Sequence, residues 1–371
     1  MTNDRADRAG AGPGGGGKRM SARGALAIAL CVALSGCGGS SEGDPIAVRQ
    51  VFGGLGDVPG RFGYPRALDV SPPAGRGLVW VVDKTGRVQG LNPADGRCEV
   101  FWRMPETELG KPVGITIGPG PDERGEWCNE LVWIADTHYY RVMVFRPPTG
   151  DRADPGHAPT LVRSFGAYGT GPGQFRYPTD VAVLYAPDGR SIQRVYVSEY
   201  GGNDRVSVFD ANFEILFSFG AFGAGRGDTP GTRRVEFDRP QAISIETVEG
   251  RQELIVIDSH NHRIGRFTLD GDLVAWYGSR DEPGDALGRF RYPQGIASMG
   301  DGTALVVEYG NNRVQHVDLA SGRGLAAWGR PGRGEGELAA PWAVGILGRT
   351  AFVLDTGNSR LLAFNAPRPR R

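Results

Sequence analysis

The chain has 371 residues, among them 59 glycines and 26 prolines that punctuate runs of valine, isoleucine, leucine, tryptophan and tyrosine. This composition excludes a disordered chain and predicts many short strands joined by tight turns. Lysine plus arginine and aspartate plus glutamate each number 42, so the formal net charge is zero. Bulk charge therefore gives no reason to expect nucleic acid or an anionic membrane surface as a partner.

Residues 1–36 are predicted to be a signal peptide. A basic segment around Lys18 and Arg23 precedes an apolar stretch over residues 25–34. That stretch has the length of a signal-peptide core and is too short to span a bilayer. Met20 could itself begin a signal of ordinary length, so it is an alternative start.

The signal is followed by the tetrapeptide Leu34-Ser35-Gly36-Cys37. It resembles the lipobox of bacterial lipoproteins, and the resemblance implies a diacylglycerol on the Cys37 thiol with cleavage before that residue. Ordinary secretion with cleavage near Gly36 is the alternative. Residues 37–45 would then be the lipidated cysteine and a flexible tether. We expect a lipoprotein anchored to a membrane of the cell envelope, outside the cytoplasm.

One skeleton returns six times in residues 46–366: a proline, a short apolar strand, an acidic residue and, about five positions later, an arginine. The acid and arginine pairs are Asp83 and Arg87, Asp136 and Arg141, Glu199 and Arg205, Asp258 and Arg263, Glu308 and Arg313, and Asp355 and Arg360. The acids lie 47 to 63 positions apart, a period that matches a four-stranded propeller blade rather than a helical hairpin. We predict an all-β, six-bladed β-propeller with four-stranded blades, and a basic tail over residues 367–371.

Two of these units carry a family resemblance. Residues 353–361 (VLDTGNSRL) and 306–314 (VVEYGNNRV) resemble the core of NHL repeats, and the resemblance implies a six-bladed propeller. The unit from Asp83 to Arg87 is one residue short of the pattern and the unit from Glu199 to Arg205 is one longer. The loops of those two blades are therefore expected to differ.

The two ends of the repeat region predict how the ring closes. The last unit stops after a third strand at residues 361–365, while residues 47–53 form an extra strand that resembles the fourth strand at 161–166. We expect the N-terminal strand to complete the last blade and so remove an open edge.

The repeated acid and arginine pairs allow two interpretations. Six carboxylates around a channel could bind a cation, or each pair could be a hydrogen-bonded clamp across the turn between the second and third strands. We favour the clamp, because all six units carry it whereas functional sites break symmetry.

The residue after each proline is expected to line the mouth of the axial channel. These residues are Arg66, Val113, Thr179, Gln241, Gln294 and Trp342. The arrangement resembles that of NHL-like peptidyl-hydroxyglycine amidating lyases, which carry zinc-binding histidines directly after three such prolines. None of the six residues here is histidine, which removes the main support for a zinc lyase. Together with Arg176, Arg291 and the aromatic residues before the prolines, this face could bind an anionic or glycan-like ligand. The alternative is that the aromatic residues fill the seams between blades while the arginines are solvated.

Histidines and cysteines give weaker signals. His138 and His260 each lie two residues after a repeat acid, and they are weak candidates for a shared metal, with a role as polar turn residues favoured. Cys98 and Cys128 could form a disulfide between neighbouring blades. The alternative is that both are unpaired, buried thiols.

These observations predict a membrane-anchored propeller, monomeric and without a cofactor, that binds a protein, peptide or glycan ligand at its channel mouth. No nucleic acid partner is expected. The alternative is a metal-dependent propeller lyase or hydrolase with its site in the axial channel.

Overall fold

The computed structural model describes residues 44–148 and 158–368. The predicted signal peptide, Cys37 and most of the predicted tether lie outside the described residues, as do the last three residues of the tail. Among the described residues, no helix is long and apolar enough to cross a membrane.

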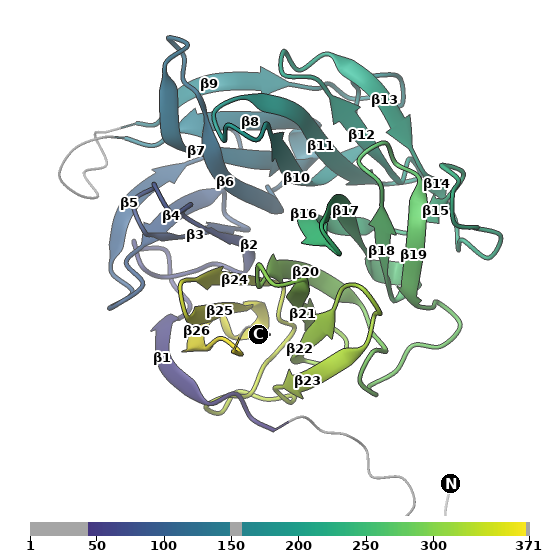
Figure 1. Cartoon of the computed structure of the whole chain (residues 1–371). Helices are drawn as coiled ribbons and strands as arrows, with labels where there is room; N and C mark the ends of the chain where they lie inside the picture. The colour runs from purple at the N-terminus through teal and green to yellow at the C-terminus, as the bar shows by residue number, and fades with distance from the viewer. Residues whose placement is uncertain (1–43, 149–157, 369–371) are drawn as a thin grey trace, which may run out of the picture. The chain divides into compact units, whose positions relative to one another are not determined.

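Six four-stranded antiparallel sheets make up the propeller (Figure 1). Blades 1 and 2 comprise β2 (Pro65–Val70), β3 (Val79–Asp83), β4 (Arg87–Leu91) and β5 (Cys98–Arg103), then β6 (Gly114–Pro121), β7 (Trp127–Asp136), β8 (Arg141–Arg146) and β9 (Thr160–Phe165). Blades 3 and 4 comprise β10 (Tyr177–Tyr185), β11 (Ile192–Tyr200), β12 (Arg205–Phe209) and β13 (Ile215–Phe219), then β16 (Pro240–Val248), β17 (Arg251–Asp258), β18 (Arg263–Phe267) and β19 (Leu273–Gly278). Blade 5 comprises β20 (Pro293–Ser298), β21 (Thr303–Glu308), β22 (Arg313–Asp318) and β23 (Gly324–Trp328). The predicted all-β, six-bladed fold is confirmed.

Blade 6 is built from both ends of the described chain. It comprises β24 (Ala343–Leu347), β25 (Thr350–Asp355), β26 (Arg360–Asn365) and β1 (Val48–Gly53). Strand β1 runs antiparallel to β26, with Val48 opposite Phe364 and Gly53 opposite Arg360. The predicted closure of the ring by the N-terminal strand is therefore present in the structure.

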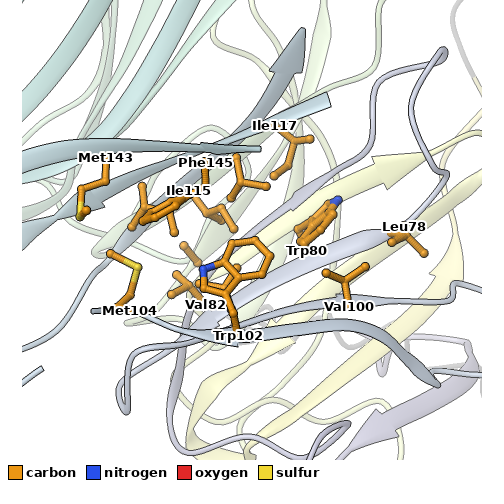
Figure 2. Close-up of a cluster of buried hydrophobic side chains, with 14 residues drawn as sticks. Leu78, Trp80, Val82, Val100, Trp102, Met104, Ile115, Ile117, Met143 and Phe145 are labelled. Atoms are coloured by element: carbon orange, nitrogen blue, oxygen red, sulfur yellow. The ribbon is translucent and has the colours of Figure 1, made fainter. Parts of the chain in front are cut away.

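The second and third strands are apolar on both faces because each blade packs between two neighbours. All five residues of β3 are buried, for example. The core is correspondingly divided among the seams between blades. At the seam of blades 1 and 2, Trp80 and Trp102 pack with ring centroids 5.7 Å apart, close to Ile115 and Phe145 (Figure 2).

The loops before the prolines explain a recurring phenylalanine. Short parallel bridges join Leu55 with Phe62 and Tyr168 with Phe175, and the Phe62 ring is fully buried; in a third bridge, Pro331 with Leu338, a leucine takes this place. The equivalent rings of Phe175, Phe237 and Phe290 are also fully buried. These phenylalanines fill the seams between blades, as the alternative interpretation of this aromatic pattern predicts. A short parallel pair, β14 (Ala221–Phe222) with β15 (Glu236–Phe237), extends one such loop.

Cys98 and Cys128 are free thiols. Cys98 packs against the core cluster that blades 1 and 6 share, whereas Cys128 packs against the cluster between blades 2 and 3. The disulfide alternative is thus wrong for this structure, because the two thiols face different seams. Burial raises the pKa of the Cys98 thiol to about 11, which keeps it protonated and unreactive at neutral pH.

Candidate functional site

The innermost strands of the six blades surround an axial cavity of about 350 Å³. Next to this cavity the channel narrows to a space of about 50 Å³, which all six residues that follow the repeat prolines line. Arg66, Gln294 and Trp342 also line a third, more open pocket of about 590 Å³. We call this third space the channel-mouth pocket. The post-proline residues are thus brought together at one constriction, and three of them extend to the pocket above it.

The channel-mouth pocket is rich in aromatic side chains. Tyr64, Tyr292 and Tyr309 line it and are 54%, 39% and 42% exposed. Trp342 lies deeper, with only 8% of its surface exposed, and Tyr309 meets it edge-on with ring centroids 5.9 Å apart. Exposed rings around a concave space are typical of sites that bind ligands through stacking.

Two arginines provide the charge of this pocket. The Arg66 guanidinium lies 4.2 Å from the centre of the Trp342 ring, and that of Arg239 lies 4.7 Å from the centre of the Tyr200 ring. Among the described residues, neither arginine forms an ion pair with a carboxylate. Burial, followed by the positive charge of Arg239, lowers the pKa of the Arg66 guanidinium. The pocket therefore holds two cations that stack on rings but are not neutralised by the protein.

Two polar groups at the base of the pocket have no hydrogen-bond partner among the described residues. These are the indole nitrogen of Trp342 and the side-chain oxygen of Gln294, whose amide nitrogen donates to Ser259 Oγ at 2.8 Å. Because a buried polar group without a partner costs about 1–3 kcal/mol, such groups mark places where a ligand or ordered water binds. The indole nitrogens of Trp102, Trp133 and Trp276 also lack a partner, but those residues do not line this pocket.

The backbone directs these side chains toward the mouth. Tyr64, Arg239, Tyr292 and Ala340 immediately precede repeat prolines and have φ angles of 55°, 62°, 48° and 49°. A left-handed conformation costs about 1–2 kcal/mol for a residue with a Cβ, and it persists only where the surrounding structure imposes it. All four strained residues line the channel-mouth pocket. Such clustering of strain is typical of functional sites.

Other residues predicted for this site have different places. Arg176 donates to Tyr168 Oη at 3.0 Å, and Arg291 is exposed; neither lines the channel-mouth pocket. Thr179 is fully buried, and its hydroxyl hydrogen-bonds Ser198 and donates to the carbonyl of Pro240. Gln241 accepts from Arg239 Nε at 3.1 Å, so it orients that arginine.

Sequence reasoning missed Tyr309, Lys84 and Lys111 as members or neighbours of this site. A signal was available, because Lys84 and Lys111 are the only lysines in the described part of the chain. Lys84 lies 5.6 Å from the centre of the Tyr64 ring. Burial, then the charges of Lys84 and Arg66, lower the pKa of Lys111, so the two lysines extend the positive charge around Arg66.

The two candidate metal-binding histidines have different contacts. His138 Nδ1 accepts from the backbone N–H of Lys111 at 2.9 Å. His260 lines the channel-mouth pocket, and its Nδ1 lies 3.2 Å from Asp238 Oδ1. Within residues 44–148 and 158–368, no group of three or more His, Cys, Asp and Glu side chains could hold a metal ion.

Each repeat acid forms an ion pair with its arginine. The shortest distances are 2.6 Å for Arg87 and Asp83, 2.9 Å for Arg141 and Asp136, 2.7 Å for Arg205 and Glu199, 2.8 Å for Arg263 and Asp258, 2.5 Å for Arg313 and Glu308, and 2.7 Å for Arg360 and Asp355. All six acids are completely buried. Arg205, Arg313 and Arg360 also donate to backbone carbonyls of the loop before the proline of their own repeat. These pairs tie the second and third strands to that loop, and the buried carboxylates do not line a channel.

Two further carboxylates do face the axial cavity. Asp69 accepts from the backbone N–H of Ile117 at 2.6 Å, and Asp180 accepts from that of Ile243 at 3.0 Å, so each links its blade to the next. Burial raises the pKa of Asp69 to about 7 and that of Asp180 to about 8, and the Asp69 charge raises the latter further.

We expect this pair to make stability depend on pH. Both pKa values in the folded state lie above the ordinary aspartate value of about 3.9, so their stabilisation is complete below pH 4 and is lost as pH rises toward 7 to 8. Urea unfolding should give a free energy of unfolding about 2–3 kcal/mol lower at pH 8 than at pH 5.5 per carboxylate. The Asp69→Asn, Asp180→Asn double variant should flatten this profile, while Asp57→Asn on the surface should not. Equal slopes in all three proteins would contradict the expectation.

Comparisons with known proteins support the fold. No family model and no curated protein matches the chain. A structural genomics protein of unknown function from Bacteroides thetaiotaomicron is similar at 15% identity and a TM-score of 0.54, over 88% of this chain and 75% of that one. Raptor from Chaetomium thermophilum is similar at 11% identity and a TM-score of 0.53, over 88% of this chain and 30% of that one. Virginiamycin B lyase from Staphylococcus aureus gives 15% identity and a TM-score of 0.47, over 82% of this chain and 80% of that one. At these identities the two likenesses with TM-scores above 0.5 support the fold and nothing finer. The six sheets of the chain define its class, a six-bladed β-propeller.

Proposed function

We propose that this propeller is a binding module whose ligand, a protein, peptide or glycan, occupies the channel-mouth pocket. The observation that carries the proposal is the convergence of three exposed tyrosines with Trp342 and two arginines that lack ion pairs, on a pocket of about 590 Å³. That volume falls in the range of ligand sites. The unpartnered groups of Trp342 and Gln294 beneath the pocket support the same conclusion.

The finer parts of the proposal come from the sequence. We infer an NHL-type propeller tethered through Cys37 to a membrane of the cell envelope, so that the ligand is met outside the cytoplasm. Fractionation of cells producing Cys37→Ser tests the tether. Loss of acylation with release from the membrane is expected, and membrane association of an unacylated wild-type chain would contradict it.

Glycan and peptide arrays probed with the whole chain test the binding role. We expect specific binders whose signal is lost in the triple variant Tyr64→Ala, Tyr292→Ala, Tyr309→Ala, because stacking area is removed from the pocket. The matched control is Tyr168→Ala, Phe222→Ala, which removes rings that are 57% and 59% exposed outside the pocket. If every binder is retained by the triple variant, the pocket is not the binding site.

A further inference from the structure

We propose that the channel-mouth pocket recognises an acidic saccharide, a sugar ring that carries a carboxylate. The inference rests on the proposed function, since it names the ligand class for the same pocket. Three observations support it: the unpaired cations, the arrangement of the rings, and the donor and acceptor at the base.

Uncompensated positive charge is the first observation. This chain has equal numbers of acidic and basic residues, yet no carboxylate among the described residues forms an ion pair with Arg66, Arg239, Lys84 or Lys111. Their charges lie close enough that Arg239 lowers the pKa of Arg66, and Lys84 and Arg66 lower that of Lys111. Gathering like charges without counterions costs free energy that an anionic ligand would recover.

The nearby acids are engaged elsewhere. Asp238 pairs with Arg280 at 2.7 Å and with His260. Asp204 is buried and accepts from the backbone N–H groups of Arg239 at 2.7 Å and Gly202 at 3.0 Å. Neither carboxylate neutralises the guanidinium of Arg66 or Arg239, so the positive charge of the pocket is left for a ligand.

The rings favour a saccharide over an acidic peptide. Tyr64, Tyr292 and Tyr309 expose flat aromatic surface around one concave space, and such faces pack against the apolar face of a sugar ring. Arg66 lies over the indole ring of Trp342 and therefore shields the base of the pocket. A carboxylate that draws the guanidinium aside would uncover this base.

The base offers a donor and an acceptor. The Trp342 indole N–H can only donate a hydrogen bond, and the side-chain oxygen of Gln294 can only accept one. A sugar hydroxyl both donates and accepts, so it can satisfy these groups. A ring that presents a carboxylate to Arg66 and Arg239 and a hydroxyl to Trp342 and Gln294 is an acidic saccharide.

Isothermal titration calorimetry of the whole chain tests this inference. The probes are an oligogalacturonate, the methyl-esterified form of the same oligosaccharide, and a polyglutamate peptide of similar charge. At about 50 mM salt, where charges are weakly screened, the oligogalacturonate should bind at least about tenfold more tightly than its neutral ester. Its affinity should fall as salt rises, and the peptide should bind more weakly.

Matched variants separate the pocket from the surface. Arg66→Gln, Arg239→Gln should weaken oligogalacturonate binding by about thirtyfold or more, with a melting temperature close to wild type. Arg176→Gln, Arg291→Gln, which removes two arginines outside the pocket, should leave binding unchanged. Absent or ester-insensitive binding, tighter binding of the peptide, or equal effects of the two variant pairs would each overturn the acidic-saccharide assignment. If array binders of another class are lost in the triple tyrosine variant, the binding function stands while this assignment fails.

Discussion

Deletion of residues 46–53 is expected to lower the melting temperature of the propeller by about 10 °C or more, or to abolish its cooperative unfolding. The deletion removes the whole of β1, the fourth strand of blade 6, and leaves β26 as an open edge. It also removes Ile46, whose backbone N–H donates to the carbonyl of Gly336 at 3.0 Å. The first and last parts of the repeat region are then no longer joined.

A single side chain should show much of the same effect. Phe52 is 7% exposed and packs in the core cluster that blades 1 and 6 share. Phe52→Ala should lower the free energy of unfolding by about 3–5 kcal/mol, the usual cost of emptying a buried aromatic site. Differential scanning calorimetry of the deletion and of Phe52→Ala measures both effects.

The control for the deletion is removal of the other terminus. Loss of residues 367–371, the basic tail after β26, should change the melting temperature far less, because the described part of this tail, residues 367 and 368, belongs to no strand. If the deletion of 46–53 leaves the melting temperature at the wild-type value, β1 does not close the ring in solution.

The second large effect is expected at the clamp of blade 5. Glu308 is completely buried and pairs with Arg313 at 2.5 Å. Arg313 also donates to the backbone carbonyl of Arg289 at 3.0 Å, in the loop before Pro293. Arg313→Met should lower the free energy of unfolding by about 3–5 kcal/mol, since it leaves a buried carboxylate without its counterion.

The pH dependence of that loss has a defined sign. Burial already raises the pKa of Glu308 while Arg313 opposes the shift, so removal of the arginine raises this pKa further. A carboxyl with a raised pKa in the folded state loses stabilisation as pH rises. Urea unfolding should therefore find Arg313→Met more destabilised at pH 8 than at pH 5.5.

Two variants make this prediction specific. Glu308→Gln combined with Arg313→Met should be less destabilised than Arg313→Met alone, because the buried charge is gone. Arg141→Met in blade 2 is the matched comparison: Arg141 is 22% exposed and bonds only carboxylates. It should cost about 1–2 kcal/mol. Equal losses for Arg141→Met and Arg313→Met would show that burial of the pair does not control its contribution.

The propeller was predictable because its information is local and repeated. Each unit carries its own strands, its own turns and its own pair of an acid and an arginine. The repeat period of 47 to 63 residues matches a four-stranded blade rather than a helical hairpin. The N-terminal strand at 47–53 could be assigned to blade 6 because the last unit lacks a fourth strand and a sheet does not leave such an edge open.

Much of the candidate site was not predictable. Arg66, Gln294 and Trp342 were named from their position after a proline, but the same rule named Thr179, whose hydroxyl is consumed by Ser198 and Pro240. Arg176 and Arg291 lie two residues before their repeat prolines and do not line the pocket, whereas Arg239, directly before Pro240, does. Their directions depend on contacts with neighbouring blades, and one sequence does not contain those contacts explicitly.

The sequence by itself thus determined the class of fold, the number of blades and the strand that closes the ring, because hydrophobic periodicity and turn residues act over a few positions of one chain. Only the tertiary structure decided which of the repeated positions converge. Cys98 and Cys128 face different seams, whereas Arg66 and Arg239, far apart in the chain, line one pocket, and Lys84 lies near the Tyr64 ring of the same pocket. The packing of the blades against one another sets the distances between these side chains. Whether a basic side chain has a carboxylate close enough to pair with it is therefore decided by the tertiary structure.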